Sequence, residues 1–367
     1  MVRQWAPDGC AKFQIMTNNM KKTFTIGLMC VVASILFSQC HEIDLTADFK
    51  DITISYGILN AQDDIHYFKI YRGYITDENA LLEAGDWDNV YYPVDSIEVR
   101  LEEYRNGKIV RSAILDTTTA VIREEGHFPS PKQLLYYSDW KLDNESVYRL
   151  VINRRTTGDE VYAETVMVGD FTIVRPIYSW NMTLNQPYKM RFSQADNAAM
   201  YDVFLTFSYI EVDNATGAIE HKKITKRLNG DYIRASSSSE VSFNSFTPET
   251  FFTTIIQAIE TNPNVTRYTD TYYCLRLTIW AGNKNYLTYR EVATPSSSIV
   301  QNNLEYTNFI SEDESAYGLL ASRNYTYTDL MLDNTSGHNE DTLVLSPRTK
   351  RLNFDYYRHS PEFPGLK

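Results

Sequence analysis

The sequence is poor in cysteine and lacks the short motifs of common catalytic and cofactor sites. Four cysteines occur in 367 residues, too few for the dense disulfide framework of small secreted domains. The His-Glu-x-x-His, Gly-x-Ser-x-Gly, Walker and dinucleotide-binding glycine motifs are all missing, and the six histidines are scattered. We therefore expect no catalytic residues, no metal site and no bound cofactor, and we predict that the protein is not an enzyme.

The chain also lacks an excess of positive charge. Its 35 Lys and Arg residues face 47 Asp and Glu residues, which gives a formal net charge of -12. Nucleic-acid binding depends on basic patches that displace counterions from phosphates, so we expect no nucleic-acid partner. Acidic clusters at Asp86/Asp88, Glu312–Glu314 and Asp333–Asp341 match no EF-hand spacing and are expected to be solvated loops.

One uncharged apolar run, Thr23–Phe37, is too short for a transmembrane helix, which needs roughly 20 apolar residues. Lys21 and Lys22 precede it, and Ser38-Gln39-Cys40 follows it. A basic head, an apolar middle and a small-residue exit are typical of a secretory signal peptide. We predict that residues 20–40 form this signal, that residues 1–19 precede the true start, and that the remaining chain folds outside the cytoplasm.

The exit Phe37-Ser38-Gln39-Cys40 resembles a bacterial lipobox, in which the cysteine is acylated and becomes the new N-terminus. Several acyl chains on Cys40, palmitate among them, would anchor the protein durably, since one chain alone gives only marginal attachment. The alternative is ordinary signal cleavage after Cys40, which would release a periplasmic protein. We expect the lipid-anchored form, at the outer membrane or cell surface.

The first part of the mature chain is rich in strand patterns. After a tether expected at residues 41–51, Ile52–Ile58 and His66–Tyr74 are predicted strands. Asn106-Gly107 then joins two alternating runs, which is the strongest short-range marker of a type I′ hairpin. A further strand pair is expected at residues 147–153 and 160–168. We predict that residues 52–174 form an antiparallel sandwich of the immunoglobulin-like kind.

A second β-domain is predicted for residues 175–367. Tyr201–Glu211 is a long alternating strand, and residues 218–228 are its expected partner. Thr247-Pro248-Glu249 is typical of a helix start, and apolar residues then recur at helical spacing at Phe251, Phe252, Ile255, Ile256 and Ile259. One short amphipathic helix is therefore expected near residues 248–260, packed on the sheet.

The remaining segments of this domain are expected to add little regular structure. Residues 302–323 are predicted to run through loops, and residues 343–354 to form one or two strands. Cys274 lies in a strand-like run without a nearby base, and we expect a small buried apolar group. The predicted fold class is thus mainly β, with two antiparallel β-domains and a single short helix.

Trp87 and Trp140 are the candidate ligand-binding residues. Trp87 lies between two aspartates and Trp140 follows Ser138-Asp139, so both are expected at the surface, where their rings could stack on sugars. Trp280 ends a strongly alternating strand and is expected in the core. Most of the 27 Tyr and 17 Phe are expected to fill strands and cores, since aromatic residues favour both.

Eight segments carry a resemblance over nearly the whole mature chain. They are the Cys40 exit, Val161–Thr165, Ile173–Pro176, Tyr201–Glu211, Leu275–Gly282, Ser298–Gln301, Tyr306–Asn308 and Gly318–Arg323. The chain resembles a family of uncharacterised Bacteroidota surface lipoproteins that are often encoded beside TonB-dependent outer-membrane transporters. The resemblance implies surface or periplasmic residence, a role beside nutrient import and a TonB-dependent transporter as partner, and it supplies no catalytic residues.

The expected function is that of a non-catalytic binding accessory in nutrient uptake, with a glycan, a peptide or a membrane protein as partner. The alternative is a structural or adhesive surface protein, and an enzyme with a scattered site comes third. An accessory predicts a concave aromatic patch. An adhesive protein predicts an uncovered strand edge, and an enzyme predicts convergent titratable groups in a cleft.

Overall fold

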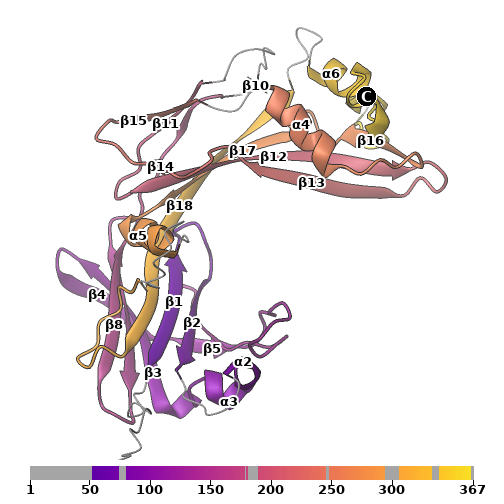
Figure 1. The fold of residues 1–367 in the computed structure, drawn as a ribbon. Coiled ribbons are helices and arrows are strands. Elements are labelled where there is room, and N and C mark those ends of the chain that lie inside the picture. The colour runs from indigo at the N-terminus through magenta and orange to yellow at the C-terminus, as the bar shows by residue number, and fades with distance from the viewer. Residues whose placement is uncertain are drawn as a thin grey trace, which may run out of the picture. The chain divides into compact units, whose positions relative to one another are not determined.

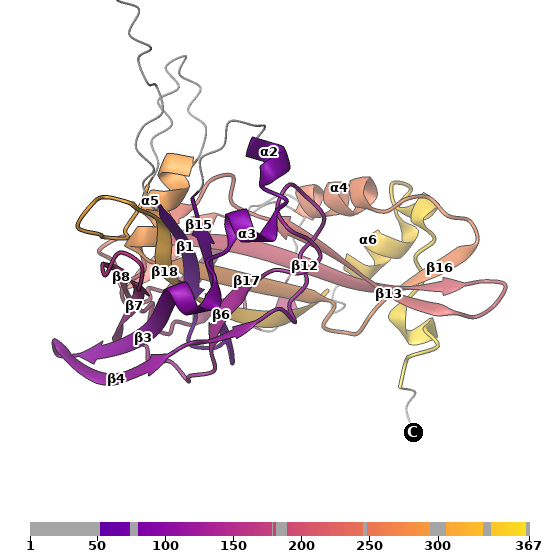
Figure 2. The same cartoon turned by 90° about the horizontal axis from the view of Figure 1, so that it is seen from below.

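The computed structural model describes residues 52–73, 80–177, 179–180, 189–244, 248–293, 306–332 and 339–364. Residues 51–367 form one compact unit. Cys40, the predicted signal peptide and the predicted tether lie outside the described residues. The described chain is mainly β and is built largely from antiparallel strands (Figure 1 and Figure 2), which confirms the prediction of a mainly β fold with antiparallel sheets.

The hairpin predicted around Asn106-Gly107 lies in a four-stranded antiparallel sheet. Asn106 and Gly107 have φ angles of 51° and 72°, the positive values that a type I′ turn requires. The sheet has the order β4-β3-β7-β8. Its strands are β3 (Ile97–Arg105), β4 (Lys108–Ile114), β7 (Val147–Arg154) and β8 (Glu160–Val166).

A second layer packs on this sheet and forms the predicted sandwich. Its strands are β1 (Thr53–Leu59), β2 (His66–Arg72), β6 (Leu135–Ser138) and β5 (Asp116–Thr118), in that order. Both layers supply the first core, which contains Phe68 from β2, Leu101 from β3 and Leu150 from β7. All three side chains are fully buried, so the core lies between the two layers.

The 17-residue strand β18 (Ala316–Leu332) is the largest departure from the sequence-based expectation, which places residues 302–323 in loops. Its first half runs parallel to β1, and its second half runs antiparallel to β17 (Leu275–Gly282). Residues 318–322 are all buried. A strand that is covered on both faces shows no alternation of apolar and polar residues. Residues 318–322 therefore lack the alternating pattern by which a strand is predicted from sequence.

β18 also changes how the chain divides between the two cores. Phe309, Ala316 and Leu320 belong to the first core, although residues 175–367 are predicted to form the second domain. The earlier part of the chain changes cores between Met167 and Val168, a few residues before the predicted boundary at 174. The first sandwich is therefore completed by a segment from the far end of the chain.

The second core is built around the long strand β12 (Met200–Asp213), where the predicted alternation is confirmed. Val203, Leu205 and Phe207 are buried. The strands that pair with β12 are β13 (Ile219–Arg227), β14 (Ile233–Arg234), β16 (Val265–Thr269) and β17. A separate sheet of β15 (Glu240–Asn244), β11 (Lys189–Ser193) and β9 (Ile173–Arg175) adds to this core, and β10 (Ser179–Trp180) pairs with β18.

The predicted amphipathic helix is α4 (Pro248–Ala258). Phe251, Phe252 and Ile255 are buried, and the ring of Phe251 meets that of Phe207 edge-on, with the centroids 5.7 Å apart. The helix therefore packs on the sheet as predicted. Its expected N-cap, Thr247, lies outside the described residues.

The expectation of a single helix is wrong. The structure adds α5 (Lys284–Ala293), α6 (Asn339–Leu345) and the single turns α2 (Ala80–Glu83) and α3 (Trp87–Val90). Leu287 is the one buried residue of α5, so this helix has no buried apolar stripe from which its spacing could be predicted. The strands expected at residues 343–354 are also wrong, since α6 and the 3-10 turn η2 (Lys350–Leu352) occupy that segment.

Two further 3-10 turns, η1 (Val94–Ser96) and η3 (Tyr357–His359), complete the secondary structure of the described chain. Across these residues, none of the helices combines the length and the apolar composition needed to span a membrane.

We predict that Gly318→Ala strongly destabilises the protein. Gly318 pairs with Ser55 at a φ of +123°, and a Cβ atom at this position would lie 1.8 Å from the Ser55 carbonyl oxygen. We expect chemical denaturation to show a loss of about 2–4 kcal/mol in the free energy of unfolding. Gly107→Ala is the matched control, because Gly107 has a φ of +72° but no neighbour within 4 Å. Equal losses in the two variants would contradict the proposed close contact.

Candidate binding site

The outer face of the β17–β18 pair carries a row of aromatic and arginine side chains. Trp280 is the register partner of Tyr325, and Arg276 is that of Asp329. Directly opposed residues of an antiparallel pair point to the same face. Leu277, Ile279 and Ala281 point the other way into the second core. We call Arg276, Trp280, Arg323, Tyr325 and Tyr327 the aromatic–arginine face.

The side chains of this face form a continuous stack. The Arg323 guanidinium lies 4.5 Å from the Trp280 ring centroid, and the Trp280 and Tyr325 centroids are 4.6 Å apart. Tyr325 stacks on Tyr327 at 6.5 Å with an interplanar angle of 23°, and the Arg276 guanidinium lies 4.4 Å from the Tyr327 centroid. Tyr327 remains 51% exposed, so a ligand can reach its ring and hydroxyl group as well as the neighbouring guanidinium groups.

The two arginines of the face differ in their partners. Arg276 donates two hydrogen bonds to Asp329, at 2.7 and 2.9 Å, and this carboxylate raises the pKa of the guanidinium. Arg323 contacts the Trp280 ring, but no carboxylate of the described residues pairs with it, and its Nε is buried without a hydrogen-bond partner. Arg323 is therefore the cation on this face that is available to an anionic ligand.

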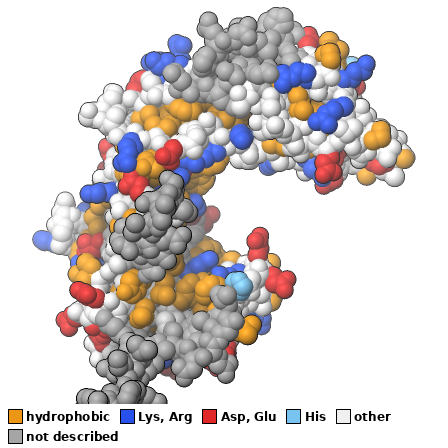
Figure 3. Space-filling model, in the orientation of Figure 1, with side chains coloured by type: hydrophobic (Ala, Val, Ile, Leu, Met, Phe, Trp, Pro, Cys, Tyr) orange, Lys and Arg blue, Asp and Glu red, His pale blue; other side chains and the backbone are white. Residues whose placement is uncertain are grey.

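Two hollows border the face. One, of about 160 Å³, is lined by Asp202, Trp280, Tyr286 and Arg323 among others. The second, of about 370 Å³, is lined by Gln62, Asp170, Tyr325 and Tyr327 among others. Figure 3 shows basic, acidic and hydrophobic side chains close together where β17 and β18 run side by side. An elongated polar ligand could thus lie across the row and enter both hollows.

Asp202 is neutralised within the smaller hollow. Arg227 donates to it at 2.6 and 3.0 Å, Asn229 donates at 3.0 Å, and Arg290 also forms an ion pair with it. Both carboxylate oxygens are therefore occupied. The hollow keeps the positive charge of Arg323 although the whole chain is acidic.

The structure does not bring Trp87 and Trp140 together. Trp87 is half-buried, with its ring centroid 4.4 Å from that of Tyr91, and packs on a small cluster with Val90. Trp140 packs on the first core, and the Arg111 guanidinium lies 3.9 Å from the centroid of its ring. Both predicted stacking residues therefore already have intramolecular partners.

The structure also differs from the sequence-based prediction at Asp86–Asp88 and at Trp280. The Asp86–Asp88 cluster is a helix start rather than a loop, because the Asp86 side chain accepts a hydrogen bond from the Asp88 backbone and caps α3. Trp280, expected in the core, is only half-buried and lies on the opposite face of the sheet. Alternation along a strand identifies its two faces but not which one is covered.

Arg323, Tyr325 and Tyr327 are not among the site residues predicted from the sequence, because the strand that carries them is not predicted either. A signal was present. Residues 323–329 alternate arginine or tyrosine with asparagine or threonine and end at Asp329, which is the period-two pattern of a half-exposed strand.

Cys274 is the buried apolar group that its sequence context predicts. It is 2% exposed, and burial raises the pKa of its thiol to about 12. The thiolate, which is the reactive form of cysteine, is therefore scarce at neutral pH. No metal site is predicted from the sequence. In the described part of the chain, one group of side chains is close enough together to hold a metal ion, namely His221, Asp270 and Glu362.

No protein-family model matches this chain, and no curated protein matches it. Among solved structures, it is weakly similar to the C-terminal globular domain of oligosaccharyltransferase from Pyrococcus abyssi, with 10% identity and a TM-score of 0.19. That match covers 74% of this chain but 44% of the other. A second similarity, to CBD12 from CALX1.2, has 10% identity and a TM-score of 0.17 and covers 76% and 99% of the two chains. These TM-scores are too low to assign a shared fold or function.

We predict that His66 makes the stability of the protein depend on pH. His66 is 2% exposed, its Nε2 donates to the Trp140 carbonyl at 2.9 Å, and its Nδ1 has no partner in the described chain. Burial lowers the pKa of His66 below 6.5, against the opposing effects of the Trp140 hydrogen bond and Asp63. The folded protein thus keeps the neutral ring, while the unfolded chain takes up a proton below pH 6.5.

The contribution of His66 to stability is therefore fully present above pH 6.5 and is lost as the pH falls through the lowered pKa. Each pH unit in this window removes at most about 1.4 kcal/mol. Urea unfolding of the native protein and of His66→Gln at pH 7.5 and 5.5 measures the difference. The variant should lose less stability on acidification, and equal losses would show that His66 does not titrate in this way.

Proposed function

We propose that this protein is a lipid-anchored outer-membrane or surface protein that binds a glycan or a peptide without chemistry, as an accessory to nutrient uptake. The observation that carries the proposal is Arg323, whose guanidinium borders a hollow beside Trp280 without a carboxylate partner among the described residues. A planar guanidinium binds carboxylate, sulfate or phosphate through paired hydrogen bonds. The ligand would therefore carry at least one acidic group.

The dimensions of the site favour an extended ligand. The hollow at Arg323 measures about 160 Å³, which is below the roughly 300–1,000 Å³ of sites that enclose a whole small molecule. It suits one sugar unit or one side chain. The rest of the ligand would lie along Tyr325 and Tyr327 toward the larger hollow, where the hydroxyl groups offer hydrogen bonds.

The ion pairs of the carboxylates beside the face favour a binding function over a catalytic one. General acid–base work needs a carboxyl group that can give or take a proton near the substrate. Asp202 is held by Arg227 and Arg290, and Asp329 is held by Arg276. Each carboxylate is thus already engaged in an ion pair with arginine.

We predict that Arg323→Ala weakens binding of an acidic oligosaccharide or peptide, identified on glycan and peptide arrays, by about tenfold or more. The reason is the loss of a charge-assisted hydrogen bond, worth roughly 1.5–3 kcal/mol. Titration calorimetry with the identified ligand measures the change. Arg155→Ala is the control, because Arg155 is an exposed arginine of the first sandwich and should leave the affinity unchanged. Equal affinity of native protein and Arg323→Ala would overturn the assignment of the site.

We predict that the mature protein extracted from its native membrane begins at an acylated Cys40. Intact-mass analysis should give the mass of the chain from residue 40 plus the lipid, and the Cys40→Ala version should lack this modification. An unmodified chain that begins at His41 would instead indicate cleavage after Cys40 and a periplasmic protein.

One observation favours the alternative, an adhesive protein. β4 is an edge strand of the four-stranded sheet, and Ile109, Val110 and Ile114 on it are 53%, 56% and 63% exposed. An exposed hydrophobic edge can pair with a strand of another chain. Arg111 and Lys108 lie on the same strand, and charged residues on an edge oppose such pairing, so the binding accessory remains the preferred function.

A further inference from the structure

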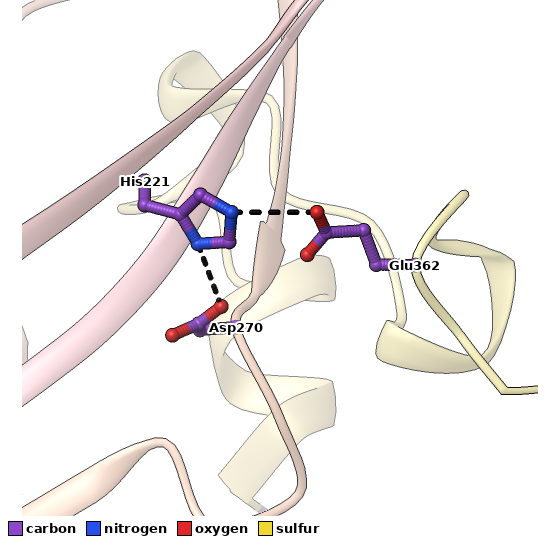
Figure 4. A group of neighbouring side chains, drawn as sticks. All are labelled: His221, Asp270 and Glu362. Carbon is purple, nitrogen blue, oxygen red and sulfur yellow. Dashed lines mark hydrogen bonds and ion pairs between the residues drawn. The ribbon is translucent and has the colours of Figure 1, made fainter.

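A cluster of potential metal ligands lies apart from the aromatic–arginine face. His221 belongs to β13, Asp270 directly follows β16, and Glu362 lies near the C-terminus (Figure 4). Their ligand atoms all lie within 4.8 Å of one another. The side chains are 55%, 26% and 35% exposed, so an ion from solution can reach them.

The imidazole of His221 stands between the two carboxylates (Figure 4). Its Nδ1 lies 3.0 Å from Oδ1 of Asp270, and its Nε2 lies 3.3 Å from Oε1 of Glu362. In tetrahedral zinc sites, two ligands at about 2.0–2.1 Å from the ion lie roughly 3.3–3.4 Å apart. The Nε2 and Oε1 atoms are thus already spaced as two ligands of one ion.

The contact between Asp270 and His221 is of a kind that is common at metal sites. Histidine ligands usually donate their second ring N–H to a carboxylate, which fixes the ring and makes the ligating nitrogen more basic. Asp270 holds Nδ1 of His221 in this way, and its own backbone N–H donates to the Ser208 carbonyl at 3.2 Å. The imidazole is therefore oriented with Nε2 toward Glu362.

The charges of the cluster also favour a cation. Within the described residues, His221 is the one basic side chain that pairs with Asp270 or Glu362. Two carboxylates therefore share a single imidazole, and a divalent ion would balance their charge. A mixed nitrogen and oxygen ligand set suits Zn²⁺, whereas Ca²⁺ and Mg²⁺ prefer oxygen ligands alone.

The segment that carries Glu362 is held in place by aromatic packing. The ring of Tyr357 meets Tyr272 at 4.9 Å and Phe363 at 5.3 Å, measured between centroids. Tyr272 and Phe363 are themselves 6.0 Å apart. Glu362 thus sits next to an anchored residue, so the ordering cost of binding an ion falls mainly on the Glu362 side chain itself.

We propose that Nε2 of His221 and the Glu362 carboxylate bind one divalent transition-metal ion, with Zn²⁺ the best match. Asp270 orients the imidazole, and water completes the coordination. The ion fastens the C-terminal segment to β13. This site is independent of the ligand proposed for the aromatic–arginine face.

Titration calorimetry of the untagged mature protein with ZnCl₂ at pH 7.5 tests the proposal. We expect one ion per chain, with affinity at least tenfold lower in His221→Gln and in Glu362→Gln and a smaller loss in Asp270→Asn. His359→Gln is the matched control, because His359 is an exposed histidine that pairs with one carboxylate, Asp355, at 2.9 Å. It should bind Zn²⁺ like the native protein, and CaCl₂ should give no binding.

Hydrogen exchange gives a second readout. Zn²⁺ should slow amide exchange in residues 356–364 of the native protein and leave it unchanged in Glu362→Gln, which keeps the size of the side chain. Absence of Zn²⁺ binding, or binding that survives both His221→Gln and Glu362→Gln, would overturn the proposal. Equal losses in His359→Gln would place the ion elsewhere.

Discussion

The sharing of β18 between two strand partners is the constraint on which the rest of the structure depends. Polar side chains fix this strand at the junction of the two cores. Ser322 donates to the Val166 carbonyl at 2.6 Å, Asn324 donates to the Gly169 carbonyl at 3.0 Å, and Asn283 donates to the Thr165 hydroxyl at 2.7 Å. All three donors are buried. An unsatisfied buried polar group is costly. These bonds therefore fix one position of β18 relative to residues 165–169, where the chain passes from the first core to the second.

The aromatic–arginine face follows from the same strand. The pairing of β18 with β17 places Tyr325 opposite Trp280 and sets Arg323 two register pairs further along, opposite Gly282. A slip of one residue would turn every tyrosine of this row toward the core. The buried asparagines therefore determine the geometry of the face as well as the stability of the junction, although none of them belongs to it.

Local features could be predicted from the sequence, whereas features created by distant pairing could not. The hairpin at Asn106-Gly107 and the helix α4 depend on residues close in sequence, and both are present. The first half of β18 could not be predicted, because it is covered on both faces and shows no alternation. His221, Asp270 and Glu362 come from three remote segments, and no spacing rule connects them. The exposure of Trp280 could not be predicted either, because strand periodicity alone does not tell which face another layer will cover.

The parallel pairing of β1 with β18 has a consequence for how the chain folds. Thr53 aligns with Ala316, so the first strand of the described chain pairs with its last strand. Contacts of such high sequence separation require loop closure before they contribute any stability, and they slow folding. The first sandwich cannot be completed while the C-terminal third of the chain is still missing. A chain that emerges N-terminus first would therefore stay incompletely folded until almost all of it is available.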